Sequence, residues 1–353
     1  MKIGVITLPF NANYGWLLQA YAMQQVLNQM GHETILISRR WNLTAQNSTL
    51  GAKILRPLYY NICCGKLYSF FNRYIKSTRE YRSSEDLKNV ISEYELDAVV
   101  VGSDQVWRIE NTRGVDYNFF LDFANDGKTK KISYAASFGN DTWAGTREDD
   151  EIIKRLLKEF SGIAVREDSG IEICKRLFNA EATCVLDPTF LLKSTDYDKV
   201  LPQKDKYAGT NLLSTYILDP TLEKDNFINK IASDKRLHVD NLFVRSWGRF
   251  RMYKSMENWL LKIRNADFVV VDSFHGMVFC IIFKKQFVVI ANKHRGNTRF
   301  VNVLSKLNLL DRLVYDLNTE VQSLYKEIDY KRVDALLDEE RKHSFDYLNQ
   351  SLS

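Results

Sequence analysis

The stretch "KIGVITLPFNANYGWLLQAYAMQQVLNQMGHETILIS", residues 2–38, contains a complete strand, helix and strand pattern. The apolar run 2–8 is typical of a buried strand. Apolar residues then recur every four positions from Leu18 to Met30, which predicts a helix, and a glycine follows as a helix stop. The run 32–38 predicts the next strand. A βαβ unit of this size is the building block of a parallel sheet.

The same alternation continues along the rest of the chain. Helical patterns lie at 148–160 and 169–178. Apolar runs with strand character lie at 96–102, 131–138, 162–167, 182–188, 212–218, 239–244, 267–272 and 286–292. Nearly continuous apolar strands are typical of a sheet that is covered on both faces. The sequence therefore predicts an α/β fold built on parallel sheets.

A polar connection at 193–206 divides this pattern into two halves. A chain of 353 residues also exceeds the roughly 100–200 residues of a single domain. We therefore expect two Rossmann-like domains, residues 1–195 and 205–353, with a surface helix at 331–350 in the second. In doubly wound folds ligands bind at the carboxyl ends of strands, so we expect the active site in the cleft between the domains.

Composition excludes several classes of protein. The content of 45% hydrophobic and 26% charged residues is that of an ordinary globular protein. The N-terminus lacks the apolar core of a signal peptide, and no run reaches the ~18 apolar residues of a transmembrane helix, so we expect a cytoplasmic protein. A net charge of +5 gives no case for a nucleic-acid partner. The five cysteines form no CxxC pair and are expected to be buried thiols.

Residues 39–79 contain basic and aromatic side chains but no acidic one. The basic residues are Arg39, Arg40, Lys53, Arg56, Lys66, Arg73, Lys76 and Arg79. Such side chains suit a lipid–water interface and phosphate head groups. One interpretation is a peripheral contact with the inner face of the membrane, or a lipid-diphosphate-linked substrate. The alternative is a solvated helical excursion whose aromatic residues lie in the core.

Two junctions after predicted strands of the first half carry polar residues. Asn13, Tyr14 and Gly15 lie where a turn meets the first helix, whose backbone N–H groups are suited to hold an anion. The alternative is a plain turn, and no GxGxxG motif is present. Ser103, Asp104 and Gln105 follow the run 96–102. They are suited to bind sugar hydroxyls, and Asp104 to orient or deprotonate one. The alternative is that Asp104 only caps the next helix.

Arg166 also follows a strand, at the end of "GIAVRED". An arginine in that place is suited to grip a carboxylate or phosphate with two N–H groups. The competing interpretation is a local ion pair with Glu167 or Asp168.

The run "VVVDSFHGMVFC", residues 269–280, is apolar except at its centre, where Ser273 and His275 occur. His275 is expected at a helix N-terminus, where a bound anion would stabilise its protonated form. Downstream, a short segment gathers Lys293, His294, Arg295 and Arg299. Such clustering suits a multiply charged anion, and a structural histidine and a solvated loop are the alternatives.

Taken together, these stretches resemble the polysaccharide pyruvyl transferase family. The resemblance rests on several motifs in a fixed order. They are "NYGWLLQAYAMQQVL", "DAVVVGSDQVW", "KISYAASFG", "IAVREDSG", "VLDPTFLL", "DSFHGMVFCIIFKKQFVVI" and "RGNTRFVNVLSKLNLLDR". The resemblance implies a fold like that of GT-B glycosyltransferases. It also implies transfer of pyruvate from phosphoenolpyruvate to a glycan of the surface or capsule as a cyclic ketal, with no metal and no further cofactor.

The resemblance also implies roles for residues. His275 matches the family's active-site histidine, Arg166 its arginine after a strand, and Arg295 and Arg299 its basic loop. Many members carry an arginine where this chain has Ser273, so phosphate binding is expected to rely more on Lys293, the arginines and backbone amides. The first domain is expected to bind the acceptor and the second the donor.

His275 is the candidate general acid and Asp104 the candidate group that aligns or deprotonates the acceptor hydroxyls. A role for His275 in phosphate binding is equally compatible with the sequence. Two other functions stay open at this point. One is a nucleotide-sugar glycosyltransferase with the same fold, and the other is a non-catalytic protein that binds glycan.

Overall fold

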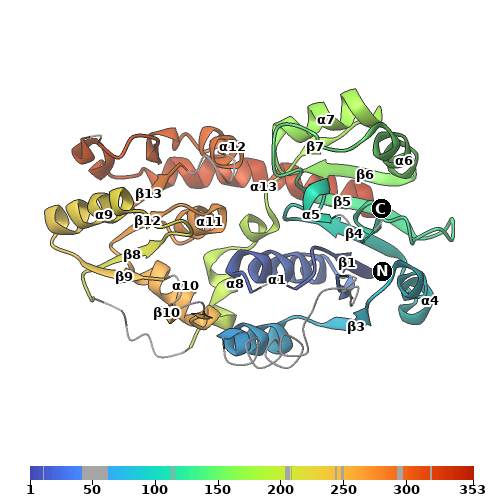
Figure 1. The fold of residues 1–353 in the computed structure, drawn as a ribbon, viewed down its shortest axis with the longest axis horizontal. Helices are drawn as coiled ribbons and strands as arrows, with labels where there is room; N and C mark the ends of the chain where they lie inside the picture. Colours follow the sequence, from blue (N-terminus) through green and yellow to red (C-terminus); the bar gives the residue numbers. More distant parts are fainter. Residues whose placement is uncertain are drawn as a thin grey trace. The chain divides into compact units, whose positions relative to one another are not determined.

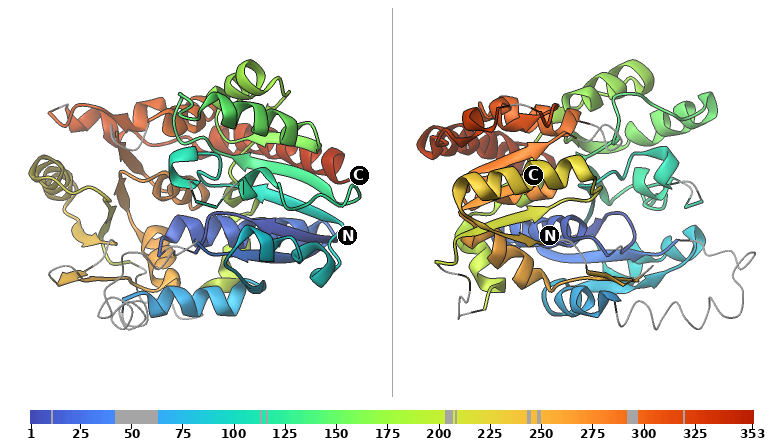
Figure 2. Two further views of the ribbon diagram at one scale, coloured as in Figure 1. Left: turned by 45° about the vertical axis from the view of Figure 1, so that its right-hand side comes forward. Right: turned by 60° about the vertical axis from the view of Figure 1, so that its left-hand side comes forward.

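The computed structural model describes residues 1–10, 12–41, 63–112, 114–115, 117–202, 207, 209–242, 245–247, 250–291, 297–318 and 320–353. The chain divides into two compact units. The first unit comprises Met1–Asn47, Asn72–Leu192 and Asp338–Ser353, and the second comprises Ser48–Phe71 and Lys193–Leu337. Each unit has its own parallel sheet and its own core (Figures 1 and 2).

The first unit contains a seven-stranded parallel sheet. Its strands are β1 (Lys2–Ile6), β2 (Glu33–Arg39), β3 (Ser77–Tyr81), β4 (Ala98–Gly102), β5 (Lys130–Ala136), β6 (Phe160–Val165) and β7 (Thr183–Cys184), in the spatial order β3-β2-β1-β4-β5-β6-β7. The strands that follow β1 in the sequence lie on both sides of it: β2 and β3 on one side, and β4 to β7 on the other. The strand order therefore reverses between β1 and β4. This reversal is the topological switch point of a doubly wound sheet, where ligands bind.

Helices cover both faces of this sheet. They are α1 (Tyr14–Gln29), α3 (Ser84–Leu87), α4 (Val90–Tyr94), α5 (Ile109–Thr112), η2 (Asn118–Phe120), α6 (Arg147–Leu157), α7 (Asp168–Phe178), η3 (Pro188–Leu191) and the end of α13 (Tyr330–Leu352). On one face, Val101 and Ile163 pack in one cluster with Ile153 of α6 and Ile173 of α7. On the other face the hydroxyl of Tyr347 in α13 donates to the Ser133 carbonyl of β5 (2.7 Å).

The second unit contains a five-stranded parallel sheet and a short antiparallel hairpin. The sheet strands are β8 (Leu212–Tyr216), β9 (His238–Asn241), β12 (Phe268–Val271), β13 (Phe287–Ile290) and β14 (Leu313–Val314), in the spatial order β14-β13-β12-β8-β9, and the hairpin pairs β10 (Arg245–Trp247) with β11 (Phe250–Met252). The strand order reverses between β8 and β12. This sheet therefore has a switch point of its own.

The second sheet is also covered on both faces. Its helices are α8 (Ser194–Tyr197), η4 (Asp198–Val200), α9 (Leu222–Lys235), α10 (Met256–Asn265), α11 (Phe274–Ile282), α12 (Thr298–Lys306), η5 (Leu310–Arg312) and η6 (Val321–Tyr325). Phe227 of α9 packs with Leu213 and Val270 on one face. On the other, Tyr216 meets Trp259 of α10 edge to face, with ring centroids 5.4 Å apart.

Each strand predicted from the sequence has a counterpart here, and β3, the hairpin and β14 are additional. The observed units differ from the predicted domain limits in two respects: Ser48–Phe71 belongs to the second unit, and α13 begins in the second unit but belongs to the first from Asp338 on. Contacts of the α13 side chains explain the second difference, because Ser344 Oγ accepts from Leu186 N (3.0 Å) and Ser351 lies against Gly162 of β6. All five cysteines are buried thiols, as predicted. Within the described ranges, none of the helices combines the length and the apolar composition of a transmembrane span.

Candidate functional site

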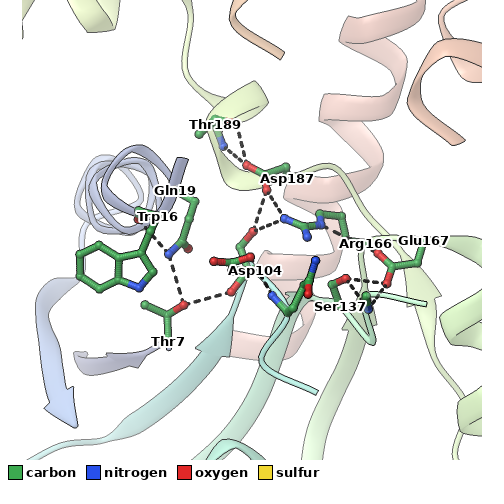
Figure 3. A network of polar contacts seen from close by, with 12 residues as sticks. Thr7, Trp16, Gln19, Asp104, Ser137, Arg166, Glu167, Asp187 and Thr189 are labelled. Atoms are coloured by element: carbon green, nitrogen blue, oxygen red, sulfur yellow. Dashed lines mark hydrogen bonds and ion pairs between the residues drawn. The ribbon is translucent and has the colours of Figure 1, made fainter. Parts of the chain in front are cut away.

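The carboxyl ends of the central strands in the first unit carry a connected set of polar side chains (Figure 3). Thr7 follows β1, Ser103 and Asp104 follow β4, Ser137 follows β5, and Arg166 follows β6. In a parallel sheet all these ends lie at one edge, and here they flank the switch point between β1 and β4. This is the position at which doubly wound folds bind ligands.

The backbone after β4 has a rare conformation. Ser103 has a φ of 32° and Asp104 a φ of 69°, so two consecutive residues with side chains lie in the left-handed region. This region costs a residue with a Cβ about 1–2 kcal/mol. The preceding Gly102 leaves no room for a side chain, because a Cβ there would lie 2.6 Å from the Tyr134 carbonyl oxygen. Such strain persists only where surrounding contacts impose it, and it is frequent at functional sites.

Hydrogen bonds hold this turn from several sides. The Ser103 hydroxyl is buried and donates to Asp187 Oδ2 (2.7 Å), and the Ser103 carbonyl accepts from the Thr7 hydroxyl (3.0 Å). The Asp104 carbonyl accepts from Ser137 N (3.1 Å). The Ser137 hydroxyl in turn donates to the buried carboxylate of Glu167 (2.6 Å). The loops after β1, β4, β5 and β6 are therefore tied into one assembly.

Arg166 lies inside this assembly. Its side chain is only 1% exposed, and its Nη1 donates to Asp187 Oδ2 at 3.0 Å, while Nε lies 3.9 Å from Glu167 Oε2. Burial lowers the pKa of Arg166, but the charges of Asp187 and Glu167 outweigh burial and raise it. The geometry favours the ion-pair alternative, with Asp187 as the nearer partner. Binding of a donor by Arg166 stays a prediction.

Asp104 and Gln105 are the partly exposed members of this edge. Asp104 Oδ1 accepts from Gln105 N (2.9 Å), which is a local turn contact. Gln105 Oε1 accepts from Arg108 Nη1 and Asn111 Nδ2, both at 3.2 Å. Because two donors already bond to the side-chain oxygen of Gln105, the NH₂ group of its amide is the part suited to bind another partner. Gly139 allows this packing, because a Cβ there would lie 2.9 Å from Arg108 Cδ.

The side chain of Asn13 caps the N-terminus of α1. Asn13 Oδ1 accepts from Gly15 N (2.8 Å) and Trp16 N (3.3 Å), so two of the first helical N–H groups already have an acceptor. Tyr14 and Gly15 are buried. This geometry favours the plain turn, and ligand binding by Asn13, Tyr14 and Gly15 stays a prediction.

The switch point of the second unit is fixed by Asp272, which follows β12 and has no exposed surface. Its carboxylate accepts from Leu218 N (2.6 Å) and Asp219 N (3.2 Å) in the loop after β8, and from Lys224 Nζ (2.7 Å) of α9. Asp272 therefore joins the two central strand ends and sets the position at which α11 begins.

His275 lies in the first turn of α11 and is partly exposed. Ser273 caps this helix, because its hydroxyl accepts from Gly276 N (3.0 Å). The ring of Phe274 has His275 at its edge, with ring centroids 5.3 Å apart, and the guanidinium of Arg299 over it, with Cζ 5.8 Å from the centroid. The structure thus brings His275 and Arg299 together around Phe274.

Three residues of the predicted basic segment, Lys293, His294 and Arg295, lie outside the described residues. Sequence reasoning missed several side chains that build these clusters. They are Thr7, Arg108, Asp187 and Phe274, together with Gln19, whose Nε2 donates to the Thr7 hydroxyl (3.2 Å), and Thr189, which donates to Asp187 Oδ1. A signal for one of them was present in the sequence: Asp187 lies near the end of the predicted strand run 182–188, and Asp104 lies shortly after the run 96–102.

The described part of 39–79 offers few positive charges to an anionic surface. Arg39 is buried and donates to Asn118 Oδ1 (2.7 Å). Arg40, Lys76 and Arg79 form ion pairs with acidic residues outside the segment. Residues 63–74 are helical, with Phe70 buried, and their exposed basic residues are Lys66 and Arg73. Residues 42–62 lie outside the described residues, so a membrane contact through this part of the segment stays a prediction.

Among the described residues, no three His, Cys, Asp or Glu side chains form a group that could hold a metal ion. A family model described as polysaccharide pyruvyl transferase matches residues 13–294, more than half of the chain, a range that includes Asp104, Arg166 and His275. The chain belongs to the polysaccharide pyruvyl transferase family. No curated protein matches the sequence.

Solved structures similar to this pyruvyl transferase family member include three UDP-N-acetylglucosamine 2-epimerases. The putative enzyme from Listeria monocytogenes has 11% identity and a TM-score of 0.53, with 98% of this chain and 90% of that one covered. The Rickettsia bellii enzyme has 12% identity and a TM-score of 0.53, with 100% and 96% covered. The Neisseria meningitidis enzyme, bound to UDP-GlcNAc, has 10% identity and a TM-score of 0.51, with 98% and 94% covered. These matches confirm the predicted fold, two Rossmann-like units of the GT-B type.

Proposed function

We propose that this protein transfers pyruvate from phosphoenolpyruvate to a sugar of a glycan precursor for the cell surface or capsule, as a cyclic ketal, with release of phosphate. The observation that carries the proposal is the family match over 13–294, which includes Asp104 of the first polar cluster and His275 of the second. The geometry supports it, because each cluster lies at the switch point of its own sheet.

The proposed reaction balances in protons and bonds. A proton adds to the methylene carbon of phosphoenolpyruvate, and its neighbouring carbon becomes electrophilic. One sugar hydroxyl adds to that carbon and a second replaces the phosphate, whose C–O bond breaks. Of the two hydroxyl protons released, one replaces the proton given to the methyl group and the other leaves with the phosphate. The protein must therefore supply an acid, a base and cations for the donor.

His275 is the proposed acid. It is partly exposed, and Arg299 lies on the same Phe274 ring, so a donor anion held by Arg299 would lie near the imidazole. Lys293 and Arg295 of the predicted basic loop are proposed to add further cationic contacts. Ser273 is proposed to act through the helix start that it caps. A role for His275 in binding the phosphate instead remains compatible with this geometry.

Asp104 is the proposed group that aligns or deprotonates the acceptor hydroxyls. It combines a partly exposed carboxylate with a backbone that several contacts fix. Gln105 presents an oriented amide beside it, which is suited to a sugar hydroxyl. A lipid-diphosphate-linked acceptor and a cytoplasmic location at the membrane stay predictions.

A second candidate, transfer from a nucleotide sugar, is favoured by the fold neighbours, one of which is bound to UDP-GlcNAc. Calorimetric titration with phosphoenolpyruvate and with UDP-, GDP- and CMP-sugars separates the two. Binding of phosphoenolpyruvate, weakened in Arg299→Ala, supports the proposal. Binding of a nucleotide sugar without binding of phosphoenolpyruvate overturns it.

A further inference from the structure

We propose that Asp187 is a positioning residue, which holds the strained turn of Ser103 and Asp104 in the conformation that presents the Asp104 carboxylate. The inference rests on the proposed function only in giving Asp104 a catalytic role. The contact by which Asp187 fixes the turn lies within the first unit, and it can be tested without a substrate.

Asp187 is only 1% exposed, and both of its carboxylate oxygens accept hydrogen bonds. Oδ1 accepts from Thr189 N (3.1 Å) and from the Thr189 hydroxyl (2.6 Å). Oδ2 accepts from the Ser103 hydroxyl (2.7 Å) and from Arg166 Nη1 (3.0 Å). Four donors from three residues fix the orientation of this carboxylate (Figure 3). It acts as a rigid anchor rather than as a group free to bind a ligand.

The anchor acts on the turn through Ser103. The hydroxyl of Ser103 bonds to a residue 84 positions away in the sequence, while its backbone has a φ of 32°. A residue with a side chain leaves the left-handed region unless contacts hold it there. The bond to Asp187 is such a contact, and Asp104 is the next residue in the chain. The direction of the Asp104 carboxylate therefore depends on the anchor.

Arg166 completes the arrangement by balancing charge. An uncompensated carboxylate in the interior would be strongly destabilising, and it would repel the nearby Asp104. The ion pair with Arg166 removes that cost. Arg166 thus supports Asp187, which differs from the prediction that it grips the donor.

Two pairs of variants test the anchor. Thr189→Val removes a hydroxyl that bonds to Asp187 and keeps the side-chain shape, whereas Thr189→Ser keeps the hydroxyl. Ser103→Ala removes the link to the turn. Its matched control is Ser133→Ala, which also removes a fully buried serine with hydrogen bonds across the sheet, to Ala164, but away from the strand ends.

The first measurement is amide hydrogen exchange of the peptide 103–107, without substrate. We expect exchange to rise about 10-fold or more in Ser103→Ala and clearly in Thr189→Val, and to stay at the wild-type level in Thr189→Ser and Ser133→Ala, because loss of an anchor increases local opening. Wild-type exchange of this peptide in both Ser103→Ala and Thr189→Val would overturn the inference, whether or not the protein transfers pyruvate.

The second measurement is acceptor-dependent phosphate release from phosphoenolpyruvate. A misplaced catalytic group lowers kcat, and we expect a loss of roughly 10- to 100-fold in Ser103→Ala with the acceptor KM within about 2-fold of wild type. A raised KM with unchanged kcat would mean that Ser103 binds substrate and would contradict the positioning role. Absence of release in the wild type would count against the proposed function, while the exchange result would still decide on the anchor.

Discussion

Lys224 Nζ lies 2.7 Å from Asp272 Oδ2, in an ion pair that is almost entirely shielded from solvent. Asp272 follows β12 and directly precedes Ser273, the cap of the helix that carries His275. We expect Lys224→Met to lower the free energy of unfolding by about 3–5 kcal/mol, because removal of one partner leaves a buried charge without compensation. Chemical denaturation followed by circular dichroism measures this change.

The matched control for this prediction is Lys284→Met. Lys284 pairs with Asp334 in the same unit, but both side chains are well exposed, at 54% and 40%. Exposed pairs contribute about 0–1 kcal/mol. Equal losses in the two variants would contradict the assignment of Asp272 as a buried anchor of the strand end.

Gly276 lies in the first turn of α11, close to the strand that precedes it. A Cβ at this position would lie 2.7 Å from Ser273 Oγ and 3.0 Å from Val271 Cγ1. Gly276→Ala is therefore expected to displace the cap and to cost about 1–3 kcal/mol, as overpacking does. At Gly65, in the helical stretch 63–74, a Cβ would meet no atom within 4 Å, so Gly65→Ala is expected to stabilise by about 0.5–1 kcal/mol. Thermal unfolding of both variants should show shifts of opposite sign, and shifts of equal sign would refute this prediction.

Gln105 is proposed to present its amide to an acceptor hydroxyl. Gln105→Leu removes that donor, and we expect the acceptor KM to rise roughly 10-fold, which corresponds to one hydrogen bond. Asn111→Ala removes only one of the two donors that hold Gln105 Oε1, so its effect should be smaller. Steady-state kinetics with varied acceptor measures both. An unchanged KM in Gln105→Leu would exclude Gln105 from the acceptor site.

Arg79 binds two carboxylates, Asp86 and Glu93, at the edge of the first sheet. Hydrogen bonds from Arg79 hold the pKa of each below its ordinary value, and Tyr81 adds to the effect on Glu93. Groups with a lowered pKa contribute stability above their ordinary values of about 4, and this contribution is lost as the pH falls through their folded values. The stability difference between wild type and Arg79→Met should therefore be present at pH 7 and shrink at pH 3. A difference that is equal at both pH values would show that the ion pairs contribute nothing.

Much of the fold could be predicted because buried parallel strands are nearly continuous apolar runs. The predicted run 267–272, for example, corresponds to the observed strand β12, and the run 96–102 corresponds to β4. β3 was missed because "STREY" contains more polar than apolar residues, as an edge strand allows. The division of α13 between the units could not be read from its charge pattern, since that pattern does not say which core its apolar face meets.

The candidate site was only partly predictable for a related reason. Strand ends identified Ser103, Asp104, Arg166 and His275 as residues of the carboxyl edge. The sequence does not show which of these side chains face one another, so the partner of Arg166 was expected among its neighbours in the chain. The structure does place Glu167 Oε2 3.9 Å from Arg166 Nε, but the nearer partner is Asp187, 21 residues away, at 3.0 Å.

The central claim is that the protein transfers pyruvate with the help of His275. The most direct test is phosphate release from phosphoenolpyruvate, with and without a pool of extracted lipid-linked oligosaccharides, by wild type, His275→Ala and a control, His238→Ala, whose histidine is exposed on β9. We expect release that depends on the acceptor, reduced roughly 100-fold or more in folded His275→Ala and unchanged in His238→Ala. Turnover near the wild-type value in folded His275→Ala would contradict the role of His275, and absence of release with every acceptor fraction would contradict pyruvyl transfer.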